Sequence, residues 1–388
     1  MQEENFETLA IRLQAERTQF KEHSVPLYLT SSYKFDDAED MRALFANEKE
    51  GNVYSRYANP NTTELIEKMA ALEGSETGWA TASGMAAIFT TFATFLKSGD
   101  HVLSSRSVFG STHQLLNNVF SKWGVTYTYA DLDKPEQWEA GIQANTKMIF
   151  VETPSNPGID IIDLEWLAKL AKQHQVLSVV DNCFATPYLQ QPIKLGIDIS
   201  IHSATKFIDG QGRTLGGIIL GSDQLIKEIE GFARHSGPAM SPFNAWLLSK
   251  SLETLAVRMD RHCENALKVA EFLESHAKIK KVMYPFLPSH PQYEIAKKQM
   301  KQGGGIVTLV IDGGVEAASQ FMNKLKMFSI SANLGDTRSI ATHPATSTHS
   351  KLTEEERLQV GIEQGTVRLS IGLEHVNDII GDVKQALG

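Results

Sequence analysis

Two short segments each place a reactive side chain at the end of a predicted strand: Val179-Val180-Asp181-Asn182 and His202-Ser203-Ala204-Thr205-Lys206. Helical and strand patterns alternate around them over residues 60–221. This alternation predicts an α/β fold, with a mostly parallel sheet and helices on both faces. Ligands bind such sheets at the carboxyl ends of the strands, so we expect Asp181 and Lys206 to face one site.

The spacing of apolar residues predicts three regions. Residues 1–55 form an N-terminal extension with one helix over 7–17 and irregular sequence after it, and residues 56–241 form the large domain. Residues 242–388 form a smaller C-terminal α+β domain. In the large domain we expect strands at 101–103, 148–151, 177–180 and 218–220, and helices at 62–72, 86–96 and 164–174. In the small domain we expect helices at 243–273 and 316–325, and strands at 305–311 and 366–371.

Composition excludes several classes of protein. A net charge of −9 over 388 residues argues against a dedicated nucleic-acid binder, and no apolar run is long enough to cross a membrane. The acidic, polar start of the chain lacks a secretory signal and predicts a cytoplasmic protein. Cys183 and Cys263 are too few for a disulfide framework. His343 and His349 lie in a loop without a Cys partner or a carboxylate cluster, so we expect no metal site.

The residue types at the two strand ends indicate one kind of chemistry. Pyridoxal phosphate needs a lysine that forms a Schiff base with its aldehyde and a carboxylate that keeps its pyridine nitrogen protonated. Lys206 and Asp181 supply these groups, and the hydroxyls of Ser203 and Thr205 could hold the phosphate. The alternative is a surface lysine that follows a buried strand. Similarly, Ser83 before a predicted helix could present backbone N–H groups to an anion or be a plain N-cap.

Taken together, six motifs resemble the cystathionine γ-synthase/lyase family, the pyridoxal-phosphate enzymes of cysteine and methionine metabolism. The resemblance covers nearly the whole chain, from about Ala15 onward. The motifs are Tyr54-x-Arg56, Ser83-Gly84-Met85, Glu152-Thr153-Pro154-x-Asn156-Pro157, Val180-Asp181-Asn182, Ser203-Ala204-Thr205-Lys206 and Val367-Arg368-Leu369-Ser370-Ile371-Gly372.

The resemblance implies a fold of the aspartate aminotransferase type, fold type I, and a role for each matching residue. Lys206 would bind the cofactor and shuttle protons, and Asp181 would pair with the ring nitrogen. Arg368 would hold the substrate carboxylate. The remaining cofactor contacts would come from Ser83, Gly84, Met85, Phe109, Asn156, Ser203 and Thr205, and from Tyr54 and Arg56 of a neighbouring subunit. The active site would then exist only in a homo-oligomer, which we expect to be a tetramer.

Two departures from the family pattern indicate a branch. Phe109 stands where the lyases have a tyrosine, and phenylalanine stacks on a ring but cannot donate a proton. Asn333 and Arg338 stand where cystathionine-handling members usually have serine and glutamate. These residues, and the stretch Asp209-Gly210-Gln211-Gly212-Arg213, resemble the acylhomoserine sulfhydrylases, most of all those that use the O-succinyl ester. Asn333 and Arg338 are therefore candidate substrate-binding residues.

The resemblance implies that acylhomoserine and sulfide are converted to homocysteine, with succinate released. Cystathionine γ-synthase or γ-lyase activity and use of the O-acetyl ester remain alternatives, as does an aldehyde-binding regulatory protein without turnover. The sequence leaves three choices open: succinyl or acetyl ester, sulfide or cysteine as donor, and dimer or tetramer.

Overall fold

The computed structural model describes residues 4–46, 48–350 and 353–388. Its larger sheet contains β1 (Thr77–Thr81), β2 (His101–Ser105), β3 (Thr126–Ala130), β4 (Thr146–Glu152), β5 (Leu177–Asp181), β6 (Ile199–Ser203) and β7 (Gly217–Gly221). The strand order is β1-β7-β6-β5-β4-β2-β3. Neighbours are parallel from β6 to β3, whereas β7 is antiparallel to β1 and β6. The predicted mostly parallel sheet is confirmed.

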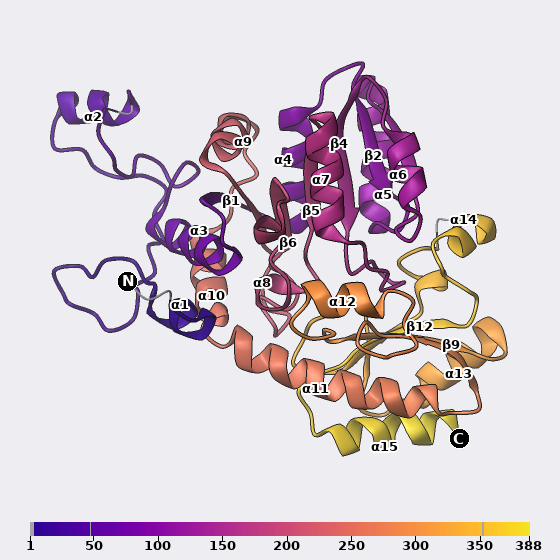
Figure 1. Ribbon diagram of the computed structural model, residues 1–388. Coiled ribbons are helices and arrows are strands. Elements are labelled where there is room, and N and C mark those ends of the chain that lie inside the picture. The colour runs from indigo at the N-terminus through magenta and orange to yellow at the C-terminus, as the bar shows by residue number, and fades with distance from the viewer. Residues whose placement is uncertain (1–3, 47, 351–352) are drawn as a thin grey trace.

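Helices cover both faces of this sheet (Figure 1). They are α3 (Pro60–Glu73), α4 (Gly84–Phe95), α5 (Gly110–Asn118), α6 (Pro135–Gly141), α7 (Leu164–His174), α8 (Thr186–Leu189) and α9 (Asp223–Ser236). Within β4, Met148 and Phe150 pack into an apolar cluster with α4, α5 and α9. Ile149 and Val151 pack into a second cluster with α6 and α7. Because both faces are buried, this strand reads in the sequence as a continuous apolar run.

A second, smaller sheet follows in the chain. It contains β8 (Ile279–Met283), β9 (Ile306–Ile311), β10 (Ser329–Ile330), β11 (Ile340–Thr342) and β12 (Thr366–Ser370), in the order β10-β11-β12-β9-β8. The accompanying helices are α10 (Pro242–Leu252), α11 (Leu255–Glu274), α12 (Tyr293–Gln299), α13 (Gly314–Lys324), α14 (Glu354–Gln359) and α15 (Val376–Leu387). Figure 1 shows α11 and α15 along the outer side of this sheet, where an apolar cluster joins them to β9 and β12. The expected smaller α+β domain is confirmed.

The helix predicted over 243–273 is in fact two helices, α10 and α11. The break lies at Glu253 and Thr254, where Thr254 leaves helical geometry. There the carbonyl of Ser251 accepts hydrogen bonds from the Thr254 N–H and from the Arg258 side chain. A polar contact that periodicity cannot reveal therefore interrupts a continuous helical pattern.

The N-terminal region also differs from its prediction. The helix expected over 7–17 is α1 (Phe6–Arg12), and the chain then turns so that the Ala15 N–H bonds Glu64. A second helix, α2 (Ala38–Phe45), was not predicted; it is short, and none of its side chains is buried. Its sequence signal is the cap, since Asp37 accepts a hydrogen bond from the Asp40 N–H.

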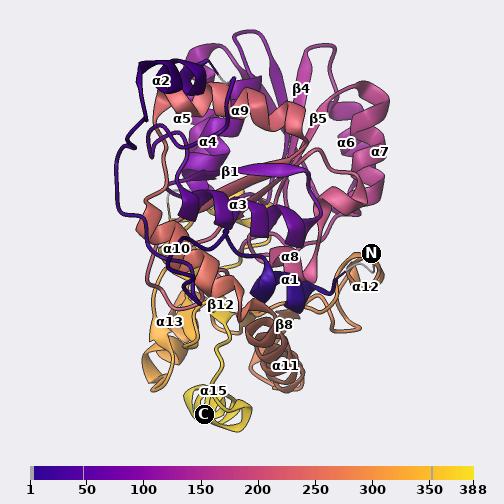
Figure 2. The same ribbon diagram turned by 90° about the vertical axis from the view of Figure 1, so that its left-hand side faces the viewer.

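The N-terminal segment has two parts that differ in their packing. Figure 2 shows α1 beside α3 and α11, against which it packs. In contrast, α2 lies at the tip of a loop that extends away from both sheets (Figure 1). No helix among the described residues is long and apolar enough to cross a membrane. The predicted boundaries at 55/56 and 241/242 stay predictions.

Candidate active site

A cavity of about 280 Å³ lies at the carboxyl edge of the large sheet, facing the small domain. Ten of the predicted site residues line it: Ser83, Gly84, Met85, Phe109, Asn156, Asp181, Ser203, Thr205, Lys206 and Arg368. They come from several elements, of which β5, α4 and β12 are far apart in the sequence. The structure therefore brings together most of the constellation that the sequence motifs predict.

Lys206 follows β6 and points into this cavity. Its Nζ donates a hydrogen bond to Asn333 Oδ1 at 2.8 Å, so a loop of the small domain holds the amine. Burial lowers the pKa of the Lys206 amine, and the nearby charge of Arg368 acts in the same direction. The alternative of a surface lysine is excluded, because Lys206 lines the cavity with the rest of the constellation.

Two carboxyl groups lie side by side at the sheet edge. Glu152 ends β4 and Asp181 ends β5, and the two residues are paired in the parallel register. Both are buried, and Glu152 Oε2 accepts a hydrogen bond from the Phe109 N–H at 2.7 Å. Burial raises the pKa of Asp181 to about 6, against which the Cys183 N–H and the charges of His202 and Lys206 act.

The same surroundings decide which of the two carboxyls is ionised. Burial and the negative charge of Asp181 raise the pKa of Glu152 well above its usual value. Since neighbouring carboxylates in a buried site resist double ionisation, the pair carries one charge near neutral pH. The Phe109 N–H and the charge of Arg368 act against the rise in the pKa of Glu152 but do not cancel it, so we expect Asp181 to carry the charge.

The N-terminus of α4 forms the part of the cavity suited to an anion. Ser83 is the N-cap, and its Oγ accepts a hydrogen bond from the Ala86 N–H at 3.1 Å, so the N-cap alternative is also correct. The N–H groups of Gly84 and Met85 have no intrahelical partner, as in any first helical turn. A Cβ on Gly84 would lie 2.6 Å from Ser203 Cβ and would fill this cradle. The free amides and the Ser203 hydroxyl fit a phosphate.

Arg368 is the buried cation of the site. It lies in β12, is 1% exposed, and donates hydrogen bonds to Asn156 Oδ1 at 2.9 Å and to the Asn333 carbonyl at 3.1 Å. Its Nε is buried without a hydrogen-bond partner among the described residues. Burial lowers its pKa to about 10, so the guanidinium stays charged near neutral pH. A buried guanidinium with an unused donor suits a substrate carboxylate.

Four predicted residues do not line this cavity. Tyr54 and Arg56 lie elsewhere in the chain, where Arg56 donates a hydrogen bond to the Arg234 carbonyl. Asn333 touches the site through Lys206. Arg338 lies outside it, with a side chain that is 66% exposed and bonded to Asp336 at 2.8 Å. A substrate role for Arg338 has no support from this placement, because Arg338 does not line the cavity.

Several further residues line the cavity without having been given a role: Ile88, Glu152, Cys183, Phe184, Leu215, Ala332, Leu334 and Thr348. For Glu152 a signal was present, because it is a carboxylate at the end of an apolar strand, as Asp181 is. Cys183 is a buried free thiol, and burial raises its pKa. The described residues contain no group of three or more His, Cys, Asp or Glu that could hold a metal ion.

A lysine, an ionised aspartate and a helix N-terminus around one cavity of a two-domain α/β fold define a pyridoxal-phosphate enzyme of the aspartate aminotransferase type. The chain belongs to the Cys/Met metabolism PLP-dependent enzymes, whose pattern matches residues 7–388. Its cofactor is pyridoxal phosphate, and the family carries out γ-replacement and γ-elimination reactions.

Three relatives show how far the similarity extends. An O-succinylhomoserine sulfhydrylase of Pseudomonas aeruginosa is 48% identical over 98% of this chain and 95% of its own. An L-methionine gamma-lyase of Fusobacterium nucleatum is 44% identical over 94% and 93%. A Campylobacter jejuni structure assigned as O-acetylhomoserine (thiol)-lyase has a TM-score of 0.95 and 37% identity, with 99% and 100% of the two chains covered. That structure contains N'-pyridoxyl-lysine-5'-monophosphate.

The cradle beside α4 gives a first prediction. We expect Gly84→Ala to bind pyridoxal phosphate at least about 10-fold more weakly, because the new methyl group would collide with Ser203. The measurement is cofactor retention followed by absorbance during dialysis. Gly231→Ala is the matched control, since Gly231 lies in α9 and its Cβ would meet no atom within 4 Å. Equal retention by the two variants would contradict the phosphate role of the cradle.

The carboxyl pair gives a second prediction. We expect Glu152→Gln to keep the acid limb of the pH profile of kcat/KM in place, because a neutral amide replaces a neutral carboxyl. Asp181 must be ionised, so activity falls as pH drops through the pKa of this residue in the working enzyme. Asp181→Asn is the contrasting variant and should lose at least about 100-fold in kcat/KM. A downward shift of the acid limb by about one pH unit in Glu152→Gln would mean that Glu152 is charged.

Proposed function

We propose that this enzyme catalyses γ-replacement: hydrosulfide displaces succinate from O-succinylhomoserine, and homocysteine is formed. Phe109, which lines the cavity, bears on which leaving group can depart from the γ-carbon. A carboxylate leaving group has a pKa of about 4 and departs as an anion, whereas a thiol has a pKa of about 8.5 and gains from a proton donor. The side chain of Phe109 offers no proton. This wall favours an acyl ester over methionine or cystathionine as the molecule that is cleaved.

The resemblance of the chain supports the same choice. Its identity to the P. aeruginosa O-succinylhomoserine sulfhydrylase is higher than its identity to the F. nucleatum methionine gamma-lyase, by 48% to 44%. This difference in identity is small, and the main support for an acyl ester is the Phe109 side chain, which lines the cavity and offers no proton. Elimination from methionine is the second candidate, and cystathionine formation from cysteine and use of the O-acetyl ester are others.

Several residues in and beside the cavity would act in this reaction. Pyridoxal phosphate, when bound, withdraws electrons and so stabilises negative charge at the substrate carbons. Arg368 holds the substrate carboxylate, and its unused Nε supplies a donor for it. Lys206, whose pKa is lowered by burial, removes the α-proton and returns protons later. Asn333 accepts a hydrogen bond from the Lys206 amine and so positions it. The carboxylate of Asp181 would keep the pyridine nitrogen of the cofactor protonated.

The test is a substrate panel with products separated by chromatography. With O-succinylhomoserine, sulfide and cysteine at equal donor concentrations, we expect homocysteine and succinate as the main products. With methionine alone, we expect 2-oxobutanoate to form at least about 100-fold more slowly, because no hydroxyl assists the leaving thiol. Mainly cystathionine, or rapid 2-oxobutanoate formation, would contradict the proposal.

The panel includes a matched pair of phenylalanine variants. Phe109→Tyr should raise methionine elimination relative to replacement, since it places a phenol at the cavity wall. Phe184→Tyr adds a phenol elsewhere in the same cavity and should not have this effect. Equal changes in the two variants would mean that the position of the hydroxyl is unimportant.

We also propose that Tyr54 and Arg56 complete the active site of a neighbouring subunit. They do not line the cavity of their own chain, yet they belong to the same family motif set. The N-terminal segment that precedes them exposes large apolar side chains: Phe20 by 82%, Leu29 by 67% and Phe45 by 54%. Exposure of several large apolar side chains along one segment supports a role for this segment in an interface. A tetramer and a cytoplasmic location stay predictions.

Subunit mixing tests the shared site. Arg56→Ala and Lys206→Ala should each be inactive alone, whereas an equimolar mixture should regain roughly a quarter of wild-type activity, because about half of randomly exchanged dimers are hybrids with one intact site of two. In a hybrid, one site combines an intact Lys206 with an intact Arg56 of the partner. Native mass spectrometry checks that hybrids form, and hybrids without recovered activity would exclude the shared site.

A further inference from the structure

A second pocket of about 380 Å³ adjoins the active-site cavity. We call it the outer pocket, and the residues that matter for its chemistry are Thr205, Arg213, Thr214, Leu215, Asn244 and Asn333. Thr205 and Leu215 also line the active-site cavity, so the two spaces share a wall. Asn333 lies one hydrogen bond of 2.8 Å from the Lys206 amine. The outer pocket therefore lies next to the space that a substrate at Lys206 would occupy.

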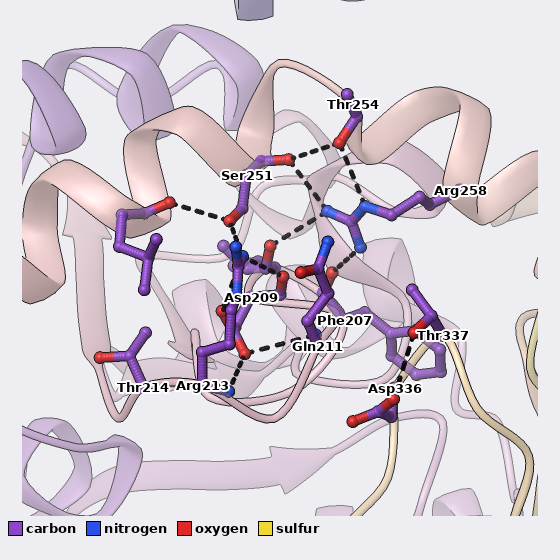
Figure 3. A network of polar contacts seen from close by, with 12 residues as sticks. Phe207, Asp209, Gln211, Arg213, Thr214, Ser251, Thr254, Arg258, Asp336 and Thr337 are labelled. Carbon is purple, nitrogen blue, oxygen red and sulfur yellow. Dashed lines mark hydrogen bonds and ion pairs between the residues drawn. The ribbon is translucent and has the colours of Figure 1, made fainter.

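Arg213 is the cation of this pocket, and its side chain is held in place (Figure 3). Its Nε donates to Asp209 Oδ1 at 3.0 Å, and its Nη2 donates to Ser251 Oγ at 2.6 Å and to the Asp209 carbonyl at 3.1 Å. Within the described residues, Nη1 has no hydrogen-bond partner. The Arg213 side chain is 35% exposed and lines the outer pocket.

The charges around Arg213 leave the loop positive. Asp209 is buried and forms an ion pair with Arg213 at 3.0 Å, and its charge also acts on the pKa of Arg258. Arg258 donates to the carbonyls of Phe207 and Ile208, and its pKa of about 10 keeps it charged near neutral pH. Two cations thus share one carboxylate. Asp336, which lies near the rim at Gly212, is already bonded to its own partner Arg338.

We propose that the outer pocket binds the distal carboxylate of a dicarboxylic acyl ester, with Arg213 as the charged donor and Asn244 and Asn333 beside it. This proposal rests on the proposed function and specifies how the succinyl group is recognised. Arg368 is required for the carboxylate of the amino-acid part, so a substrate with two carboxylates needs a second cation. Arg213 is the cation that the adjoining pocket offers.

The chemistry of the acyl group fits this placement. A succinyl ester has two methylene groups and a carboxylate beyond the ester carbonyl, which extends it on the order of 4 Å farther than an acetyl ester. An acetyl ester ends before that distance and has no charge to place there. Because Asp209 and Ser251 hold Arg213 before the ligand arrives, little side-chain freedom is lost when the carboxylate binds. The outer pocket therefore favours succinyl over acetyl esters.

The experiment compares kcat/KM for O-succinylhomoserine and O-acetylhomoserine with sulfide, using holoenzyme. For Arg213→Gln we expect the succinyl-to-acetyl ratio to fall by about 10- to 100-fold, the size of a lost charge-assisted hydrogen bond. Damage to the loop lowers both values together and leaves the ratio in place, so the ratio isolates recognition from folding. Arg213→Lys, which keeps the charge, should retain part of the ratio. A wild-type ratio in soluble Arg213→Gln overturns the proposal.

A second pair of variants leaves the Asp209–Arg213 contact intact. Asn244→Asp should lower the same ratio by at least about 10-fold, because it places a negative charge beside the distal carboxylate. Asn244→Ala is its neutral control and should have a smaller effect. Arg338→Gln tests the competing arginine: a fall in the ratio there, without one in Arg213→Gln, would assign the carboxylate to Arg338 and overturn the proposal.

Product inhibition separates this inference from the proposed function. Succinate should inhibit wild type more strongly than acetate does, and Arg213→Gln should weaken succinate inhibition by about 10-fold or more. If wild type prefers the succinyl ester but Arg213→Gln keeps that preference, the inference fails and the proposed function stands. If wild type prefers the acetyl ester, the proposed function fails. Succinate inhibition that depends on Arg213 would then still support the carboxylate pocket, and inhibition independent of Arg213 would overturn it.

Discussion

The active site depends on the parallel register at the ends of β4, β5 and β6. Glu152 pairs with Asp181, and Asp181 pairs with Ile201, so the next residues of each strand reach the same edge of the sheet. In register, neighbouring parallel strands point corresponding side chains to the same face. The two carboxyls are therefore adjacent and buried, and they compete for one negative charge. The charges of Lys206 and His202 favour the ionised form of Asp181, whereas burial and the charge of Asp181 raise the pKa of Glu152 despite the hydrogen bond from the Phe109 N–H.

The small domain contributes Arg368 to the cavity and Asn333 beside it. Arg368 reaches across to Asn156, and Thr308 Oγ1 donates to the Pro157 carbonyl at 2.6 Å, so both contacts hold the loop after β4. Asn333 comes from the small domain as well and fixes Lys206. The site therefore lies between the two domains and takes residues from both. A relative movement of the domains would change the surroundings of the Lys206 amine.

The backbone that directly follows Lys206 is fixed by hydrogen bonds from α11. Arg258, at the start of α11, donates to the carbonyls of Phe207 and Ile208, which directly follow the lysine. Gly210 can approach this guanidinium because it has no Cβ and adopts a positive φ of 72°. The break between α10 and α11 exposes the Ser251 carbonyl, which Arg258 also bonds. The same break that interrupts the helical pattern therefore anchors the loop that carries both Lys206 and Arg213.

The sequence by itself determined the strand ends, the cofactor and ten of the residues that line the cavity. An apolar run followed by Asp181, or by Ser203 to Lys206, places reactive groups at a sheet edge wherever the chain folds this way. Only the tertiary structure decided which carboxyl of the Glu152–Asp181 pair is favoured to ionise. It also decided that Arg213 lines the outer pocket, whereas Arg338 lies outside it. The reason is that the surroundings of a charge depend on which residues are close in space. Asp336 forms an ion pair with Arg338, whereas Asp209 forms one with Arg213 and its charge also acts on Arg258. The spacing of these residues in the sequence does not reveal the contact between the Asp209 loop and α11.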